Sequence, residues 1–205
     1  KLSKYEPDSH AEISRITQEL PYFDIQLLSP DLAVSSLDFS IEKNDIRYGL
    51  NSIKGVSEKS LEALERFRNS ERPNKFDTFS AAKEAKINIG LLSALIQAGT
   101  LKSLSDKSRS RLVLEAQTFN LLTDKEKAYA LSVAEKYNYD ILKIVKEAAF
   151  NEDKPVAKRA DGRVFMTDKR KSTFKKKYHE YKKIYIQNND SEDFATGLSS
   201  LNAAS

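Results

Sequence analysis

The segment from Ile53 to Lys59, Ile-Lys-Gly-Val-Ser-Glu-Lys, has the composition of a tight turn that leads into a helix. Gly55 allows backbone conformations that a Cβ would resist, and Ser57 suits the cap position before the helix. In such a turn, several backbone N–H groups converge at the start of a helix and form a site for an anion. Lys54 and Lys59 add positive charge beside this site. The segment therefore predicts phosphate binding rather than catalysis.

The longer stretch from Leu50 to Leu64 fits the helix-hairpin-helix pattern. This element holds the phosphate backbone of a duplex without contacting base edges, so its grip is independent of DNA sequence. The pattern commonly has Gly where this chain has Ser57, although Ser caps a helix and also donates to phosphate. The alternative is an ordinary pair of helices in which Gly55 is only a cap, and on this segment alone both interpretations stay open.

A second candidate turn follows at 98–102, Ala-Gly-Thr-Leu-Lys, between a helix that ends at Gln97 and one that opens near Ser105. Hairpins of this kind often act in pairs, because two turns hold two phosphates of one duplex. The candidate DNA-binding residues of this second turn are Gly99, Thr100, Lys102 and Arg109.

Positive charge is concentrated late in the chain. From Lys158 to Lys183 there are eleven Lys or Arg residues and three acids, a local charge of +8, whereas the whole chain carries +4 and the remainder therefore about −4. A basic segment on a slightly acidic chain indicates a polyanionic partner. The candidate phosphate contacts here are Lys169, Arg170, Lys171, Lys175, Lys176, Lys177, Lys182 and Lys183.

The same segment predicts a helix over about 169–187, because aromatic residues recur along one face at positions 174, 178, 181 and 185. We expect this stripe to pack on the core rather than to stack on bases. The lysines lie on other faces, where they either neutralise phosphates or simply keep the helix hydrated. Given the upstream hairpin, we favour contact with DNA.

The rest of the chain predicts a mainly α fold with a small β-hairpin. Alternation of polar and apolar residues indicates strands on either side of Lys43-Asn44 between Asp38 and Leu50, and another short strand over 22–29. Helical spacing follows Gly49, and Thr123-Asp-Lys-Glu126 is a capping box that starts a helix. The expected helices are at 8–20, 57–67, 78–85, 91–97, 105–119, 124 onward, 139–149 and 169–187, with a loop at 151–162 and a frayed tail from 197.

Composition excludes several classes of site. The chain of 205 residues has no Cys and two His, so disulfides and thiolate metal sites are ruled out and a histidine metal site is not expected. No apolar run is long enough to cross a bilayer, and the first residues do not form a signal peptide. We expect a cytoplasmic protein, and because the chain does not begin with Met we expect a fragment.

Several short motifs, taken together and in order, resemble the alpha subunit of bacterial DNA polymerase III, a replicative polymerase of the C family. The similarity covers roughly 22–115. The motifs are Leu27-Leu-Ser-Pro30-Asp31, Phe39, Ile46-Arg47-Tyr48-Gly49-Leu50, Ile53-Lys54-Gly55-Val56, Phe76-Asp-Thr-Phe79 and Leu95-Ile96-Gln-Ala98-Gly99. Ser29 replaces the first residue of the family's double proline and Ala33 a common Asn, departures that we expect of a phage or prophage version.

The resemblance implies a part of the polymerase that follows its catalytic palm. Residues 1–49 then correspond to the end of the fingers with the β-hairpin, residues 50–122 to a tandem helix-hairpin-helix region that contacts duplex DNA, and residues 123–205 to a helical extension with the basic helix. The palm motif has no match here, so no catalytic residue is assigned. No cofactor is expected in this fragment, and Mg²⁺ is expected only in the palm of the parent polymerase.

A protein-interaction module is the alternative to a DNA-binding one. In the family, this region lies next to a peptide that binds the sliding clamp, and Gln117-Thr-Phe-Asn-Leu-Leu122 is faintly similar to that peptide. Phe119 and Leu122 also fall at helical spacing on the core side of a predicted helix, and we favour that interpretation. The expected partners are thus double-stranded DNA and the rest of the polymerase chain, with a sliding clamp or another replisome protein as the alternative and no membrane.

Overall fold

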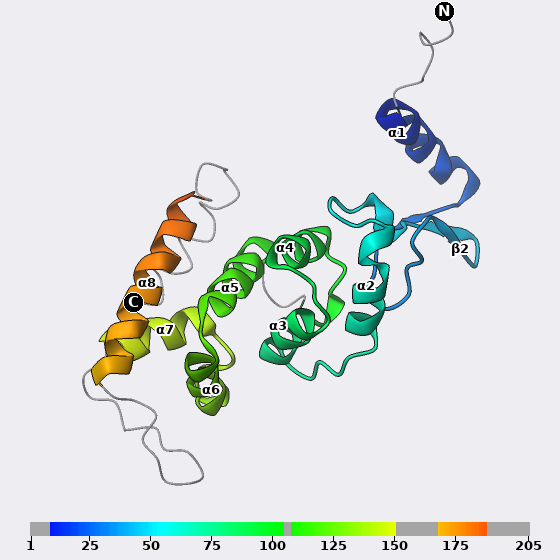
Figure 1. Ribbon diagram of the computed structural model, residues 1–205. Helices are drawn as coiled ribbons and strands as arrows, with labels where there is room; N and C mark the ends of the chain where they lie inside the picture. Colours follow the sequence, from blue (N-terminus) through cyan, green and yellow to red (C-terminus); the bar gives the residue numbers. More distant parts are fainter. Residues whose placement is uncertain (1–8, 105–107, 151–167, 188–205) are drawn as a thin grey trace, which may run out of the picture.

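The computed structural model describes residues 9–104, 108–150 and 168–187 (Figure 1). Within these ranges the protein is mainly α, with one small sheet, so the predicted fold class is confirmed. The α-helices are α1 (Ser9–Glu19), α2 (Leu61–Arg68), α3 (Lys75–Glu84), α4 (Ile89–Ala98), α5 (Arg109–Leu121), α6 (Asp124–Ser132), α7 (Ile141–Phe150) and α8 (Asp168–Gln187). The shorter 3-10 turns are η1 (Leu20–Phe23), η2 (Leu50–Ser52), η3 (Glu58–Ser60), η4 (Lys102–Leu104) and η5 (Glu135–Tyr137).

The sheet contains β1 (Leu27–Leu28), β2 (Ser40–Glu42) and β3 (Asp45–Arg47) in the order β1-β3-β2. The antiparallel pair β2–β3 confirms the predicted hairpin. β1 adds to it in parallel, with Leu27 opposite Ile46, so the sheet has one strand more than the hairpin. The strand predicted over 22–29 is wrong in its first half. Pro21 stands near the start of the 3-10 turn η1, and the backbone of such a turn does not pair in a sheet.

Side-chain caps define the starts of the central helices. Asn88 accepts from the N–H of Leu91 at 2.9 Å and begins α4. Thr123 and Glu126 form the predicted capping box of α6, in which the Thr123 N–H donates to the Glu126 carboxylate at 2.8 Å. α5 begins at Arg109 rather than near 105, because the cap residue is Ser108. The predicted loop at 151–162 and the tail from 197 lie outside the described residues.

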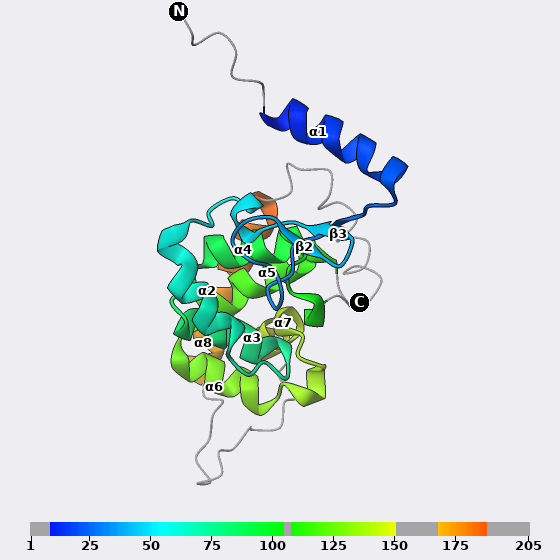
Figure 2. The ribbon, with the colours of Figure 1, turned by 90° about the vertical axis from the view of Figure 1, so that its right-hand side faces the viewer.

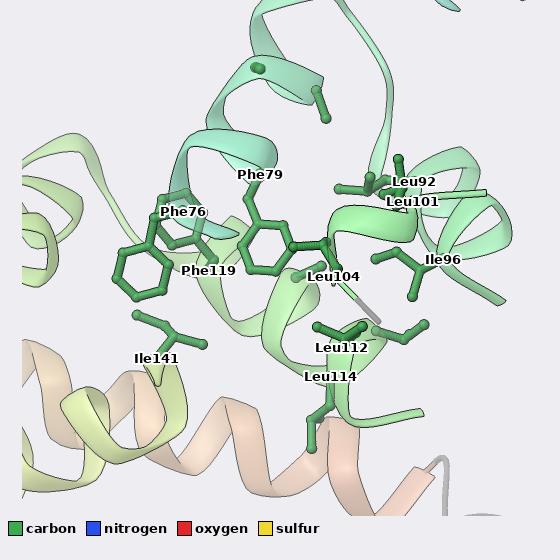
Figure 3. Close-up of a cluster of buried hydrophobic side chains, with 14 of the residues drawn as sticks. Phe76, Phe79, Leu92, Ile96, Leu101, Leu104, Leu112, Leu114, Phe119 and Ile141 are labelled. Carbon is green, nitrogen blue, oxygen red and sulfur yellow. The ribbon is translucent and has the colours of Figure 1, made fainter. Parts of the chain in front are cut away.

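The core is built from aromatic and aliphatic side chains of α3, α4, α5 and α7 (Figure 3). The Phe76 and Phe119 rings lie 5.2 Å apart between their centroids, and the Phe79 ring lies 5.7 Å from that of Phe119. Ile141 and Phe174 are fully buried in the same cluster. The aromatic stripe of α8 therefore packs on the core, as predicted from its spacing.

The helices are arranged so that α8 and the sheet lie on opposite sides of the molecule. α8 packs against α7 and α5. Figure 1 shows α8 on one side and α2 with the sheet on the other, and the view in Figure 2, from the sheet side, places α8 behind α4 and α5. Among the described helices, none is long and apolar enough to cross a membrane.

Candidate nucleic-acid interface

The first turn runs from η2 through Gly55 to η3 and α2. The buried Ile53 anchors it to the core, and the Val56 N–H closes it by donating to the Ile53 carbonyl at 3.0 Å. Gly55 has φ +91°, a region that L side chains rarely adopt, so the expectation that this turn requires glycine is supported by its backbone. Lys54 and Gly55 are both exposed at the tip.

The helix-hairpin-helix pattern implies a helix before this turn, and the structure has the 3-10 turn η2 in that place. The N–H groups of Leu50 and Asn51 donate to the carbonyls of Ser36 and Leu37 at 2.9 Å each, so the start of η2 is tied to the preceding loop. Gly49 makes this approach possible, because a Cβ there would lie 2.3 Å from the backbone of Leu37 and Asp38. The motif therefore has a full second helix but only a short first one.

Several donors of the first turn have no protein partner among the described residues. The N–H groups of Gly55, Glu58 and Lys59 form no hydrogen bond there. These are the orphan donors at a helix start that an anion satisfies. Ser57 is the cap residue, as expected, but its own N–H donates to the Ser60 hydroxyl at 3.0 Å and is already in use. Ser57 itself is exposed.

Lys54 and Lys59 supply the charge of this turn. Both side chains are exposed, and neither forms an ion pair with a residue that the structure describes. An exposed cation without an internal counterion keeps its full attraction for an external anion. The first turn thus combines free amides with uncompensated positive charge.

The second turn is built differently. Gly99 ends α4 in the left-handed conformation with φ +75°, as predicted for a helix C-terminus. The Gly99 N–H donates to the Ile96 carbonyl at 3.0 Å and the Thr100 N–H to the Leu95 carbonyl at 3.1 Å. The hydroxyl of the buried Thr100 also donates to Leu95, at 3.0 Å. The structure therefore turns the donors of Thr100 inward, because the carbonyls at the end of α4 need partners.

Lys102 and Arg109 bring positive charge to the second turn. The Lys102 ammonium lies 2.8 Å from the Asp31 carboxylate, yet its side chain is 65% exposed. Burial opposes ionisation of Asp31, but the hydrogen bond and the charge of Lys102 outweigh it and lower the pKa of that carboxyl. Arg109 donates to the Gln97 carbonyl at 2.9 Å, and its guanidinium lies 2.5 Å from where a Cβ of Gly99 would stand. Gly99 therefore makes room for the Arg109 side chain.

The structure brings both turns to one groove. An open groove of about 380 Å³ is lined by Lys54 from the first turn and by Gln97 and Ala98 beside the second. Gly55 sits over α4, since a Cβ there would lie 4.0 Å from the Leu91 side chain. Ala98, the first residue of the second turn, therefore lies in the same groove as Lys54 of the first turn.

The basic helix divides its cations between exposed and half-buried positions. The exposed ones are Lys169, Lys175, Lys176, Lys182 and Lys183. Arg170, Lys171 and Lys177 are half-buried, and Lys177 pairs with Glu180 at 3.4 Å. Lys182 lies over the Tyr178 ring, 5.1 Å from its centroid. Because α8 lies on the side of the molecule opposite the sheet, these cations form a surface separate from the first turn (Figures 1 and 2).

A buried charge cluster was not expected from the sequence. Glu115 is fully buried in α5, where it pairs with Lys75 of α3 and accepts from Arg111 at 3.0 Å. Arg111 also reaches Asp140 at 2.6 Å. Burial raises the pKa of Glu115 despite these cations. The signal in the sequence was a carboxylate next to Ala116 in the apolar stripe of a helix.

The peptide at 117–122 is part of the core. Phe119 is 2% exposed and Leu122 4% exposed, so both apolar side chains that a clamp would have to contact lie inside the protein. This confirms that these side chains belong to the core.

A family model described as a helix-hairpin-helix motif matches residues 24–112. DNA polymerase III subunit alpha of Aquifex aeolicus is 29% identical over 136 residues, which cover 64% of this chain and 12% of that protein. The subunit of Thermus aquaticus is 29% identical over 116 residues, covering 56% of this chain and 9% of that protein. The subunit of Mycobacterium leprae is 30% identical over 117 residues, covering 53% and 9%.

The chain thus spans about a tenth of the length of the curated relatives it matches. The matches confirm the family resemblance predicted from the motifs. Residues 24–112 match a helix-hairpin-helix family model, and the chain is similar to a segment of the alpha subunit of bacterial DNA polymerase III.

Proposed function

We propose that this chain is a non-catalytic module of a replicative DNA polymerase that holds duplex DNA by its phosphates and so supports DNA synthesis. The similarity to polymerase alpha subunits supports the assignment to a replicative polymerase. The helix-hairpin-helix motif supports binding through DNA phosphates. The observation that carries the proposal is the first turn, where Gly55 at φ +91° exposes free N–H groups between Lys54 and Lys59.

The first turn has the geometry of a phosphate site without base recognition. Its free donors belong to the backbone at a helix start, and its side-chain donors are flexible ammonium groups. Backbone amides and lysines bind phosphate oxygens equally well on any DNA sequence. We therefore assign the strongest phosphate contact to Lys54, Gly55 and Lys59, with the Ser57 hydroxyl as a further donor.

The second turn contributes cationic side chains to the proposed DNA contact rather than free backbone N–H groups. Gly99 and Thr100 shape it, while Lys102 and Arg109 keep their cationic groups at the surface although both also bind protein oxygens. Binding a phosphate there requires only that the exposed side of each group faces the strand. We propose this turn as the weaker contact of the pair.

The basic helix is the third contact. Its exposed lysines lie on a different side of the molecule from the first turn, so they extend the DNA footprint instead of reinforcing one phosphate site. Each phosphate that a lysine neutralises releases counterions from DNA, and binding becomes correspondingly sensitive to salt. Arg170, Lys171 and Lys177 contribute less because they are half-buried.

Binding of this kind requires no cofactor from this chain. We propose that Mg²⁺ acts in the palm of the longer polymerase and not here, and that the module works in the cytoplasm of a bacterial or phage-infected cell. The contacts to DNA that we propose are ionic and hydrogen-bonded, which suits a surface that must move along the duplex.

A salt-titrated binding measurement on a fluorescent duplex tests the proposal. The Lys54→Glu variant should weaken binding and flatten the slope of log K against log salt by about 0.9 or more, since at least one phosphate contact is lost. The matched control is Lys125→Glu, an exposed lysine of α6 with the same change of charge. Equal effects of both variants, or duplex binding that ignores salt, would contradict the proposal.

A further inference from the structure

The groove between the turns has a surface that phosphate binding does not use. Its walls include apolar groups of Pro30, Ile53 and Ala94, and its volume of about 380 Å³ is within the range of small-molecule sites. A phosphate held on the first turn needs none of these apolar groups. The groove therefore offers room for a part of the ligand that is flat and partly apolar.

Hydrogen-bonding groups stand around this surface. The exposed Gln97 side-chain amide and the Tyr48 hydroxyl have no hydrogen-bond partner among the described residues, and both residues line the groove. The Ser52 hydroxyl, by contrast, donates to the Gly49 carbonyl at 2.6 Å. The Tyr48 ring is held by Phe39, with 5.0 Å between the ring centroids. An amide with both a donor and an acceptor matches the edge of a nucleobase.

We propose that this groove receives one unpaired nucleotide of a DNA strand whose neighbouring phosphate lies on the first turn. Lys54 connects the two parts of this site, because it belongs to the turn and also lines the groove. The base lies against the apolar wall formed with Ala94 and bonds to Gln97 or Tyr48. The inference rests on the proposed function, and it adds a preference for DNA with an unpaired base.

An unpaired base is required for a physical reason. A base inside a duplex is stacked and paired, and extruding it costs a few kcal/mol, whereas a base at a bulge, gap or single-stranded junction is already free. The backbone contacts of the turn are the same in both kinds of DNA. The groove can therefore discriminate between them only through the base.

The test compares a continuous duplex with the same duplex carrying one unpaired adenine, replaced by 2-aminopurine as a fluorescent reporter. The wild-type chain should bind the bulged duplex more tightly, on the order of tenfold, given what contact with one base contributes. The Ala94→Leu variant fills the groove with a good helix former, and Gln97→Ala removes the amide. Each should reduce the preference toward unity and leave the affinity for continuous duplex unchanged.

Asn120→Leu is the matched control, because it adds the same side chain at an exposed position of α5 outside the groove. The Asn120→Leu variant should keep the preference for the bulged duplex and the change in 2-aminopurine emission on binding. A wild-type chain that binds both duplexes equally, or a folded Gln97→Ala variant that keeps the full preference, overturns the inference. Loss of all duplex binding on Lys54→Glu, with the groove variants unaffected, would support the phosphate site alone.

Discussion

The Lys102 ammonium and the Asp31 carboxylate lie 2.8 Å apart, and this ion pair joins the segment before the first turn to the second turn. A backbone hydrogen bond runs beside it, from the Leu32 N–H to the Thr100 carbonyl at 3.0 Å. The sheet segment therefore helps to position the second turn, although it lies some seventy residues earlier in the chain. Changes at Asp31 should affect both folding and the placement of charge.

Asp31→Asn should destabilise the protein at neutral pH by about 1 kcal/mol, because it weakens a partly exposed ion pair while Asn still accepts from the Ala33 N–H. Urea unfolding followed by circular dichroism measures the change. Asp38→Asn is a suitable control, since Asp38 is near the same sheet and forms no ion pair with a described residue. An equal loss in the control would show that this pair is not the cause.

The contribution of Asp31 should also depend on pH. Its pKa in the folded protein is lowered below the model-compound value of 3.8, so its ionised form stabilises the fold above that value. This stability is lost as the pH falls through the folded pKa. The difference in unfolding free energy between wild type and Asp31→Asn should be largest near pH 7 and should shrink below about pH 4. A difference that grows on acidification would contradict this assignment.

Gly55→Ala should weaken duplex binding, and Gly55→Val should weaken it further. A Cβ at φ +91° costs roughly 1–2 kcal/mol, which the turn can relieve only by changing its backbone and moving its free amides. The loss should be similar for DNA of any sequence, because phosphates carry no sequence information. Gly90→Ala, within helix α4, is the control for the added methyl group. If folded Gly55→Val binds like the wild type, the hairpin is only structural.

Glu115→Gln should cost about 3–5 kcal/mol of stability, because it leaves the cation of Lys75 buried without its partner. Glu84→Gln, at an exposed position of α3, should stay within about 0.5 kcal/mol of the wild type. Thermal unfolding measures both. At a temperature where Glu115→Gln is folded, its duplex affinity should equal that of the wild type, since the cluster lies inside the protein.

What the sequence predicts well is local. The spacing of Phe174 and Tyr178 predicted the buried face of α8, and the pair Thr123–Glu126 predicted the start of α6, because caps and helical faces depend on residues a few positions apart. The third strand, the short η2 and the inward donors of Thr100 could not be predicted in this way. The third strand and η2 depend on partners that are distant in sequence. The donors of Thr100 depend on which carbonyls at the end of α4 need a hydrogen bond. Both conditions are set only when the elements pack together.

The exposure pattern of α8 gives a graded prediction for the extent of the DNA footprint. Lys175 and Lys176 are exposed and form no ion pair with a described residue, whereas Lys177 is half-buried and pairs with Glu180. Changing Lys175 and Lys176 to Gln keeps good helix formers, so folding should be little affected. If both lysines contact phosphates, the slope of log K against log salt should flatten by up to about 1.8, since each contact contributes roughly 0.9.

Adding Lys177→Gln should flatten the slope further by less than one full contact, because that lysine already has a counterion. The matched control changes Lys143 and Lys146, two exposed lysines of the neighbouring helix α7, to Gln. If Lys143 and Lys146 attract DNA only at long range, the slope of log K against log salt should hardly change in this control. Such attraction is screened beyond about 8 Å at physiological salt. An unchanged slope in the folded Lys175/Lys176 variant would confine DNA binding to the turns and leave the lysines of α8 as a hydrated surface.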